Sequence, residues 1–245
     1  MLCLNTGTIA TEGVSAMGSV QLACRERIGT MAGISLTASL PEVVIAGARD
    51  LERSAIEHFV ANEFLRQYGA VVQQFMPWLL GLSCHDELVG VAGLRPAADG
   101  TLFIEQYLDR PIEAEVALHT GLPVARHRIL EIGNLAGHYP GVTRSLFPLL
   151  TELIYMRGYA WGVCNTTHTV QNALFRLGIP FVPMVRAVPE RLGNARFAWG
   201  TYYSTETTVI AISSRAAHDA LMDKPALAAA CSLALATHYR QLPAA

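Results

Sequence analysis

The sequence predicts an α/β (α+β) fold, in which a mixed, twisted central sheet is flanked by helices. The first observation is the order of elements in residues 128–178, where strand, loop, helix, strand and helix follow one another. Such a unit builds a parallel strand pair, and ligands usually lie at the carboxyl ends of those strands. The second observation is the composition, since 245 residues with 51% hydrophobic and 16% charged residues can bury a sizeable core.

Residues 1–104 divide into an arm, a helix, a short apolar run and two strands. Residues 1–40 are rich in Gly, Ser, Thr and Ala, and we expect a loosely structured N-terminal arm with a short strand near residues 34–40. Apolar residues at helical spacing predict a helix from Arg49 to Gly69. A short apolar run at 76–82 and a polar turn at 85–87 lead to a strand at 88–94. Asp99-Gly100 predicts a hairpin to a second strand at 101–104.

The rest of the chain carries the parallel unit and a helical tail. A strand at 128–136 precedes the loop 137–144, and Pro148 places the start of the next helix near Ser145, because proline is tolerated in a first turn. That helix runs to Met156, and a strand at 160–164 and a helix at 170–177 follow. After Pro180 the pattern is irregular until a strand at 207–212 and an Ala-rich helical region at 214–239. We therefore expect an arm (1–40), one domain (41–212) and a C-terminal helical extension (213–245).

Charge and cysteine usage exclude several classes of function. With 18 Lys+Arg against 20 Asp+Glu, the chain lacks the basic excess of a nucleic-acid-binding protein. The five cysteines are scattered, with no C-x-x-C or Cys/His cluster, which predicts no metal site and favours the reducing cytoplasm. No signal-peptide pattern begins the chain, and the apolar segment 226–237 is too short to cross a bilayer. The sequence therefore favours a cytoplasmic protein.

Several motifs together resemble known acyltransferases. Residues 149–179, LLTELIYMRGYAWGVCNTTHTVQNALFRLGI, follow the rhythm of the GNAT superfamily: amphipathic helix, Arg-Gly-Tyr, strand, Asn, helix and Leu-Gly-aliphatic. Residues 91–113 and 128–136 are similar to the acyl-homoserine-lactone synthase branch of that superfamily. Residues 51–203 most resemble the thermostable hemolysin family, because FMPWLL, GLRPA, LFIEQYLD, EIGNLA, YPGVTR and WGTYY occur in that family's order.

This resemblance implies both a fold and a reaction. In the GNAT-like fold two central strands splay apart, and the pantetheine arm of an acyl thioester fills the wedge like an extra strand. The implied activity is N-acyl transfer from acyl-CoA, or from the phosphopantetheine of an acyl carrier protein, to a small amine, in signal or secondary-metabolite biosynthesis. The expected partners are therefore an acyl carrier protein and a small amine substrate.

Three residues are the candidates for catalysis. Glu131 lies inside an apolar strand, where a carboxylate is costly unless it is paired or takes part in chemistry. It is a candidate base for the amine, directly or through water; the alternative is a structural salt bridge to one of three arginines, Arg95, Arg126 or Arg128. Glu105 begins a dense polar run between apolar segments. Phe175 stands where many GNAT enzymes have the Tyr that protonates the leaving thiolate, so the candidate proton donors are Tyr139, Tyr107 and water.

A second group is predicted to bind the acceptor. Arg95 ends the GLR strand and can hold a carboxylate in a bidentate fork, or else pair with Glu105 or Glu131. Arg66 falls in a region that closes over the acceptor in the homoserine-lactone branch; the alternative is the polar edge of a helix. The predicted substrate-binding residues are Arg66, Arg95, Gln106 and Tyr107.

A third group is predicted to bind the donor. Free N–H groups at a helix N-terminus favour a phosphate, and the loop before residue 145 offers such groups. That loop lacks the full Arg/Gln-x-x-Gly-x-Gly/Ala motif of CoA-using GNAT enzymes, which favours a single phosphate on a carrier protein. The predicted donor-binding residues are Asn134, Leu135, Ala136, Gly141, Val142, Thr143, Arg144 and Asn165.

Two other functions compete with acyl transfer. The family name and the apolar tail support a membrane-lysing protein, but the tail lacks the Lys/Arg-lined face of a surface-binding helix, so membrane contact is not favoured. The incomplete phosphate loop and Phe175 also fit a catalytically inactive GNAT scaffold that binds an acyl carrier protein.

Overall fold

A seven-stranded mixed sheet forms the centre of the computed structural model, which describes residues 42–139 and 141–245. The strand order is β1-β2-β3-β4-β5-β7-β6. Only β4 and β5 pair in parallel among these described strands. The strands are β1 (Glu42–Ala46), β2 (Trp78–Cys84), β3 (Glu87–Pro96), β4 (Ile129–Gly137), β5 (Trp161–Thr167), β6 (Val182–Arg186) and β7 (Thr207–Ser213). The parallel pair is the one that the sequence predicts.

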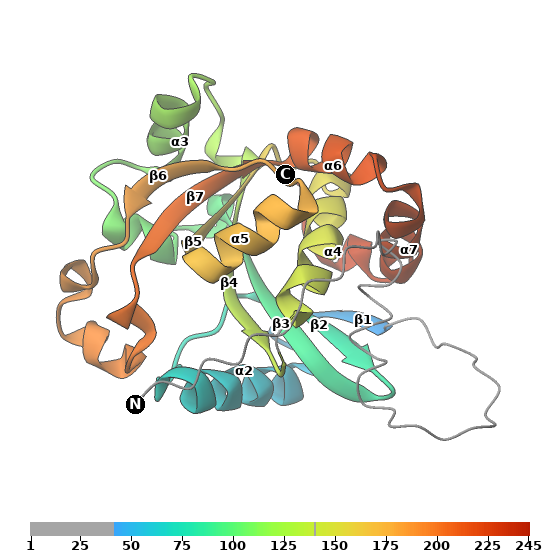
Figure 1. Ribbon diagram of the computed structural model, residues 1–245, viewed down its shortest axis with the longest axis horizontal. Coiled ribbons are helices and arrows are strands. Elements are labelled where there is room, and N and C mark those ends of the chain that lie inside the picture. Colours follow the sequence, from blue (N-terminus) through green and yellow to red (C-terminus); the bar gives the residue numbers. More distant parts are fainter. Residues whose placement is uncertain (1–41, 140) are drawn as a thin grey trace, which may run out of the picture.

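Helices cover the sheet, as the sequence predicts. Figure 1 shows α4, α6 and α7 gathered on one side of the molecule and α2 along its lower end. The α-helices are α2 (Arg53–Tyr68), α3 (Ile112–Thr120), α4 (Val142–Met156), α5 (His168–Leu177), α6 (Ser214–Met222) and α7 (Pro225–Leu235). Short 3₁₀ helices are η1 (Ala97–Asp99), η2 (Phe103–Tyr107), η3 (Arg126–Arg128), η4 (Pro189–Trp199), η5 (Tyr202–Ser204) and η6 (Tyr239–Gln241). Among the described helices, none is long and apolar enough to span a membrane.

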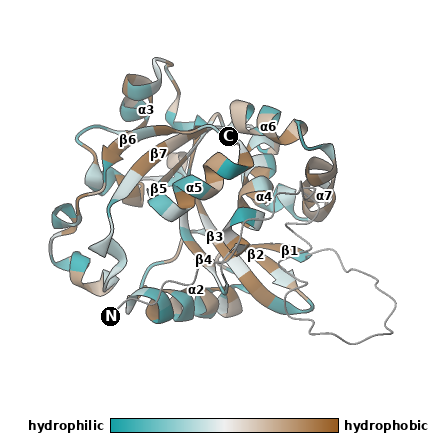
Figure 2. Ribbon diagram, in the orientation of Figure 1, coloured by the Kyte–Doolittle hydropathy of each residue, from teal (hydrophilic) through white to brown (hydrophobic). Residues whose placement is uncertain are grey.

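The two faces of the sheet pack against different layers, because side chains alternate along each strand. On β4, Leu130 and Ile132 join the core cluster that contains α4, α6 and α7. Ile129 joins the cluster on the opposite face, with residues of η2 and α3. Glu131 therefore points to the face of η2. Figure 2 shows the hydrophobic residues of β2 and β3 and the mixture of polar and apolar residues on α2.

Three local predictions differ from the structure. The strand predicted at 101–104 is wrong: these residues lead into η2, whose first N–H groups are bound by Glu131 instead of a neighbouring strand. The start of the helix near Ser145 is also wrong, because α4 begins at Val142 and Pro148 lies in its second turn. The Ala-rich region forms two helices, since Pro225 disfavours helical backbone at the residue before it.

Other elements were missed or cannot be compared. The segment after Pro180 contains β6, which pairs with β7 at the edge of the sheet. The polar turn at 85–87 is confirmed: His85 and Asp86 both have positive φ, as a two-residue hairpin between β2 and β3 requires. The arm at 1–40 and the strand near 34–40 lie outside the described residues.

Candidate active site

The parallel strands β4 and β5 separate halfway along their length. Their pairing ends at Ile132 and Cys164, although β4 continues to Gly137 and β5 to Thr167. A bulge accompanies the separation, since two residues of β4, Asn134 and Leu135, lie opposite the single residue Ala92 of β3. Asn134 has a φ of +44°, and its side chain accepts a 2.7 Å hydrogen bond from the Met76 backbone N–H. The splayed strands that the sequence predicts are therefore present.

A cavity of about 480 Å³ occupies this wedge. It is lined by Leu135 and Asn165 from the separated strands, by Glu131 on one face of the sheet and by Phe147 of α4 on the other. Another part of the wall comes from residues 71–76 and from residues 189–204, which we call the η4–η5 loop. These two segments are joined by backbone hydrogen bonds from Val71 N–H to Ala198 O (2.7 Å) and from Thr201 N–H to Tyr68 O (2.8 Å).

Glu131 is the buried carboxylate of the cavity wall. Its side chain accepts hydrogen bonds from the backbone N–H groups of Phe103 (3.0 Å) and Ile104 (2.9 Å), and the residue is 1% exposed. Burial raises the pKa of Glu131 to about 7, although these two N–H donors and nearby Arg95 oppose the rise. Among the described residues, no arginine forms an ion pair with Glu131. A carboxyl group with a pKa near neutrality can exchange a proton with an amine.

Arg95 and Gln106, two of the residues predicted to bind the acceptor, also line the cavity. Arg95 lies directly opposite Glu131 in the β3–β4 ladder, so both side chains project from the same face of the sheet. One of its NH groups donates to Thr101 O at 3.2 Å, while its Nε is buried without a partner. A guanidinium with unused donors beside a cavity can bind an anionic group.

Glu105 has a different environment from Glu131. Both of its oxygens accept from Arg126 (2.7 and 2.9 Å), and each also accepts a backbone N–H, from Leu102 or Ile112. Burial opposes ionisation, but these four donors lower the pKa of Glu105 to about 2. The carboxylate is not among the residues that line the cavity, and its bonds fix η2 and the start of α3. Such a group is ionised at neutral pH and already fully hydrogen-bonded.

Aromatic side chains form much of the wall near Glu131. The aromatic box comprises Phe64, Phe103, Trp199, Tyr202 and Tyr203, all of which line the cavity. Ring centroids of Trp199 lie 5.5 Å from those of both Phe103 and Tyr202. Tyr107 is buried behind the box, and its hydroxyl is hydrogen-bonded to that of Tyr203. Tyr107 therefore supports the wall from behind. It does not line the cavity, and Tyr203 stands between it and the position of a bound substrate.

The predicted donor-binding residues of the strands divide between the cavity and the core. Asn134, Leu135 and Asn165 line the cavity, whereas Ala136 is buried opposite Val91 of β3. The Asn165 side-chain oxygen is buried without a hydrogen-bond partner. Because buried polar atoms are normally paired, this oxygen is available to an N–H group of a ligand in the wedge.

The predicted phosphate loop lies at the N-terminus of α4. Gly141 adopts φ +101° before Val142, and the Arg144 N–H is already bonded to Gly141 O at 3.0 Å. The Nε of Arg144 is buried without a partner. The side chain of Thr143 lies outside the described part of the structure. The helix terminus therefore offers one arginine and few free N–H groups to an anion.

Arg66 and Tyr139 lie outside the cavity lining. The Arg66 side chain is 54% exposed, and it donates to Glu63 and to the His138 carbonyl oxygen. Burial would raise the pKa of Glu63, but hydrogen bonds from Arg66 and His138 lower it. Tyr139, beyond the end of β4, packs partly against the core on the α4 side. Phe175 is 79% exposed on α5, so its ring is also outside the wedge.

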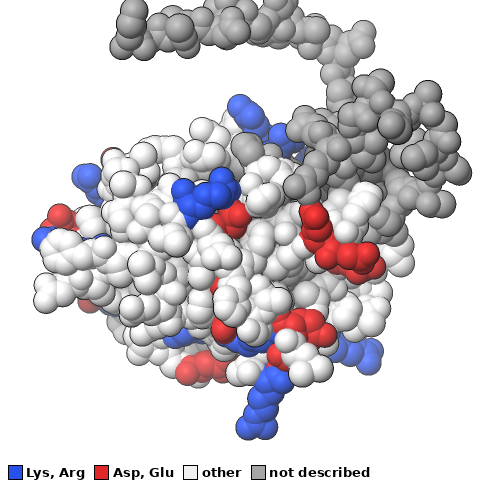
Figure 3. Space-filling model, turned by 90° about the horizontal axis from the view of Figure 1, so that it is seen from below, with Lys and Arg blue, Asp and Glu red and all other residues white. Residues whose placement is uncertain are grey.

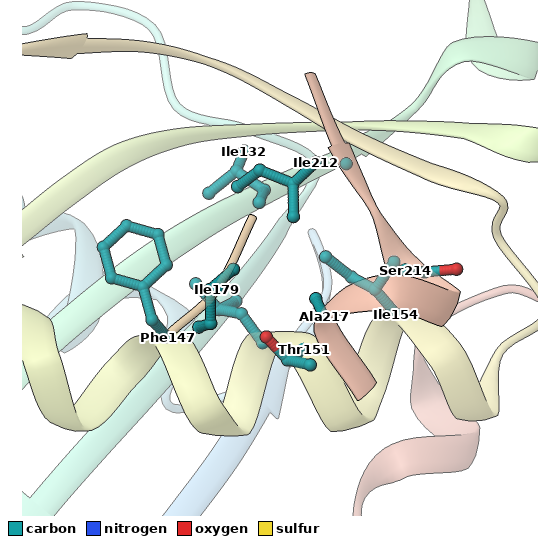
Figure 4. Close-up of a pocket in the computed structure, with 10 residues that line it drawn as sticks. Ile132, Phe147, Thr151, Ile154, Ile179, Ile212, Ser214 and Ala217 are labelled. Atoms are coloured by element: carbon teal, nitrogen blue, oxygen red, sulfur yellow. The ribbon is translucent and has the colours of Figure 1, made fainter. Parts of the chain in front are cut away.

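A small apolar pocket of about 10 Å³ adjoins the cavity. Figure 4 shows Phe147, Thr151 and Ile154 of α4 facing Ile132 and Ile212 of the sheet. Ile132 and Phe147 line both the small pocket and the main cavity. The wedge therefore leads from the aromatic box on one face of the sheet toward apolar side chains on the other.

Two further observations concern other kinds of chemistry. Cys164 lines the cavity, and burial raises the pKa of its thiol to about 12, so it is a protonated thiol near neutral pH. Among the described residues, no three His, Cys, Asp or Glu side chains gather in a group that could hold a metal ion.

The sequence did not indicate several wall residues. Phe103 and Phe147 each lie in an apolar run, where an aromatic residue is ordinarily read as part of the core. Gln73, Gln74 and Phe75 follow α2 without any periodic pattern. Only their tertiary position beside β4 makes them part of the site.

Comparison with known proteins supports the fold. A family model described as thermostable hemolysin matches residues 46–218. The chain superimposes on BjaI, a CoA-dependent acyl-homoserine lactone synthase solved with SAM and isopentyl-CoA, with a TM-score of 0.52 and 12% identity over 76% of this chain and 90% of that one. It superimposes on TofI in a ternary complex with an inhibitor and MTA, with a TM-score of 0.50 and 14% identity over 76% of this chain and 99% of that one. No curated protein matches the sequence. The predicted GNAT-like fold is confirmed.

Proposed function

The chain belongs to the thermostable hemolysin family, and we propose that it is an N-acyltransferase that moves an acyl group from an acyl thioester to a small amine. The observation that carries this proposal is the cavity between β4 and β5, which has a buried carboxylate of near-neutral pKa in its wall. A wedge of unpaired strand edges suits an extended amide-containing chain, because such a chain can hydrogen-bond to exposed backbone groups.

In the proposed reaction the amine nitrogen attacks the thioester carbonyl carbon. Glu131 takes the proton that the nitrogen loses, and the carbon–sulfur bond breaks to release a thiolate, which takes a proton from water. Backbone N–H groups near Asn134 and Leu135 are the proposed donors to the oxyanion. Glu105 is assigned to holding η2, and so indirectly to positioning the N–H groups that hold Glu131.

The donor's pantetheine arm is proposed to lie along Asn134, Leu135 and Asn165. The unpaired Asn165 oxygen fits an amide N–H of that arm. The acyl chain would extend toward the cavity wall at Ile132 and Phe147, since apolar chains favour apolar walls.

The phosphate end of the donor would lie at Gly141, Val142, Thr143 and Arg144. Because the start of α4 has few free N–H groups, we propose phosphopantetheine on an acyl carrier protein as the preferred donor and acyl-CoA as the alternative. Both donors occur in the cytoplasm, which is the compartment that we propose for the protein.

The test is intact-mass analysis of acyl carrier protein and of acyl-CoA after incubation with the purified full-length chain and a pool of amines. We expect loss of the acyl group from one donor and at least a 100-fold slower loss with Glu131→Gln, as when a general base is removed. Glu190→Gln, an exposed carboxyl outside the cavity, is the matched control and should keep the wild-type rate. Retention of the acyl group on both donors would refute the proposal.

A further inference from the structure

The charged groups of the cavity indicate which amine it accepts. Among the described residues that line it, Arg95 and Glu131 are the only two with charged side chains. They have opposite signs and are direct neighbours in the β3–β4 ladder, where opposing side chains have Cβ atoms about 4.5–5.5 Å apart. A ligand that satisfies both has one cationic and one anionic group close together, as when the two are bonded to the same carbon atom.

The aromatic box begins next to the same carboxylate. The Phe103 backbone N–H donates to Glu131 at 3.0 Å, and the Phe103 ring lies 5.5 Å from that of Trp199. Tyr202 and Tyr203 extend this wall from the far side, with their ring centroids 5.5 and 6.1 Å from that of Trp199. Such a wall favours a planar apolar group, because aromatic pairs gain more than their buried area alone provides.

We propose that the acceptor is a free α-amino acid with an aromatic side chain, an inference that rests on the proposed function. Its amino group lies at Glu131, its carboxylate binds the guanidinium of Arg95, and its ring packs in the aromatic box. The unpaired Nε of Arg95 is one of the donors for the carboxylate.

The charge balance separates this acceptor from related amines. An amine without a carboxylate leaves Arg95 unpaired in the cavity wall, which is costly for a desolvated charge. An amino acid whose side chain carries a further charge, such as the sulfonium of S-adenosylmethionine, brings a charge for which the described lining has no counter-charge. A neutral ring satisfies both conditions.

The first experiment measures equilibrium binding to the full-length protein by calorimetry, with and without CoA. The ligands are phenylalanine, its decarboxylated analogue phenethylamine and S-adenosylmethionine. We expect phenylalanine to bind at least about 10-fold more tightly than phenethylamine, as a charge-assisted pair provides. This preference should fall to less than about 3-fold in Arg95→Gln. Arg176→Gln, an exposed arginine of α5 outside the cavity, is the matched control and should keep the preference.

A second variant tests the aromatic box independently of Arg95. Trp199→Ala should weaken phenylalanine binding about 10-fold and reduce the difference between phenylalanine and alanine. Thermal unfolding of each variant shows whether it is folded. Equal binding of phenylalanine and phenethylamine to the wild type, an unchanged preference in folded Arg95→Gln, or tightest binding of S-adenosylmethionine would each overturn the inference.

Turnover separates this inference from the proposed function. Acyl transfer to phenethylamine as fast as to phenylalanine would refute the amino acid acceptor and leave the acyltransferase intact. Selective binding of phenylalanine without acyl transfer from either donor would refute the proposed acyltransferase activity, while the inferred binding site for an aromatic amino acid would stand.

Discussion

The near-neutral pKa of Glu131 makes the proposed reaction depend on pH. Burial raises this pKa to about 7, and the residue acts as a base only when it is deprotonated. We therefore expect kcat/KM to fall about tenfold per pH unit below pH 7 and to level off above it. Initial rates from pH 5 to 9 with a fixed acyl donor measure this profile, and Glu190→Gln should reproduce it. A flat profile between pH 5 and 8 would exclude Glu131 as the base.

The pKa of Glu105 is shifted in the opposite direction, and this shift affects the stability of the fold instead of the reaction. Its folded pKa of about 2 lies below the ordinary value of 4.5, so its stabilisation is complete above pH 4.5 and is lost as the pH falls toward 2. This stabilisation by the ionised Glu105 is about 3.5 kcal/mol, at about 1.4 kcal/mol per pKa unit. Glu105→Gln should therefore lower the free energy of unfolding by about this amount at pH 7 and flatten its pH dependence below 4.5.

Urea unfolding from pH 2 to 7 checks this expectation, with the exposed Glu42→Gln as a control. If Glu105 were instead a second catalytic base, its substitution would lower kcat and leave the free energy of unfolding unchanged. The two carboxylates of the LFIEQYLD and EIGNLA motifs thus have distinguishable roles.

Among the elements, the contact between the η4–η5 loop and the end of α2 closes the cavity wall. Gly200 lies at this contact with φ +52°, and an added Cβ would come within 2.0 Å of the Tyr68 carbonyl oxygen. Gly200→Ala should therefore separate the loop from α2, raise the KM for the acceptor at least about 10-fold and make the loop more sensitive to proteolysis.

Gly193 of the same loop is a matched control. Its φ and ψ (55°, −131°) nearly equal those of Gly200 (52°, −124°), but an added Cβ would meet no atom within 4 Å. Gly193→Ala carries the same backbone strain without the clash. Equal KM values for the two variants would show that strain, and not the contact with Tyr68, governs acceptor binding.

Elements whose pattern is local could be predicted from the sequence, and those that depend on distant partners could not. The β4–α4–β5–α5 unit was predicted because its periodicity and glycine stops lie within the unit itself. The N–H groups of Phe103 and Ile104 find their acceptor on Glu131, 27 or more residues away, so no local signal distinguished η2 from a strand. Similarly, β6 contains Pro183, which an edge strand tolerates but which hides the strand pattern.

The site shows the same division. Glu131 is recognisable from the sequence because a carboxylate inside an apolar strand is unusual, and Arg95 because it ends an apolar strand with a group that can hold a carboxylate. The aromatic box was not recognised as one feature, because its members come from α2, η2 and the η4–η5 region and meet only in the folded chain. Pairings such as Glu105 with Arg126 depend on side-chain direction, which sequence spacing does not give.

At the scale of the whole molecule, the C-terminal helices α6 and α7 belong to the same hydrophobic core as α4. Leu227, Cys231 and Leu235 of α7 are buried in the same cluster as α4. The chain end is fixed to the end of α4 by hydrogen bonds from Tyr159 Oη to Pro243 O and from Ala245 N–H to Arg157 O, both 3.0 Å. Figure 3 shows that charges on the face seen from below lie in small separate groups of both signs. We therefore propose that residues 213–245 fold together with the domain at 41–212.

This arrangement bears on the lytic activity that the family name records. A tail that inserts into membranes would expose the apolar side chains of α7 to the lipid, whereas here Leu227, Cys231 and Leu235 are buried in the protein core. Leu235 is 0% exposed and Leu233, two residues earlier on the same helix, is 62% exposed.

Leu235→Asp should lower the free energy of unfolding by more than about 3 kcal/mol, because it buries an unpaired charge, and Leu233→Asp should change it by less than about 0.5 kcal/mol. Urea unfolding measures both, and dye leakage from liposomes is recorded in parallel. Leakage that is abolished in the stably folded Leu233→Asp protein would show that the tail acts on membranes; we expect that variant to leave leakage unchanged, because its neighbours on α7 remain packed against α4.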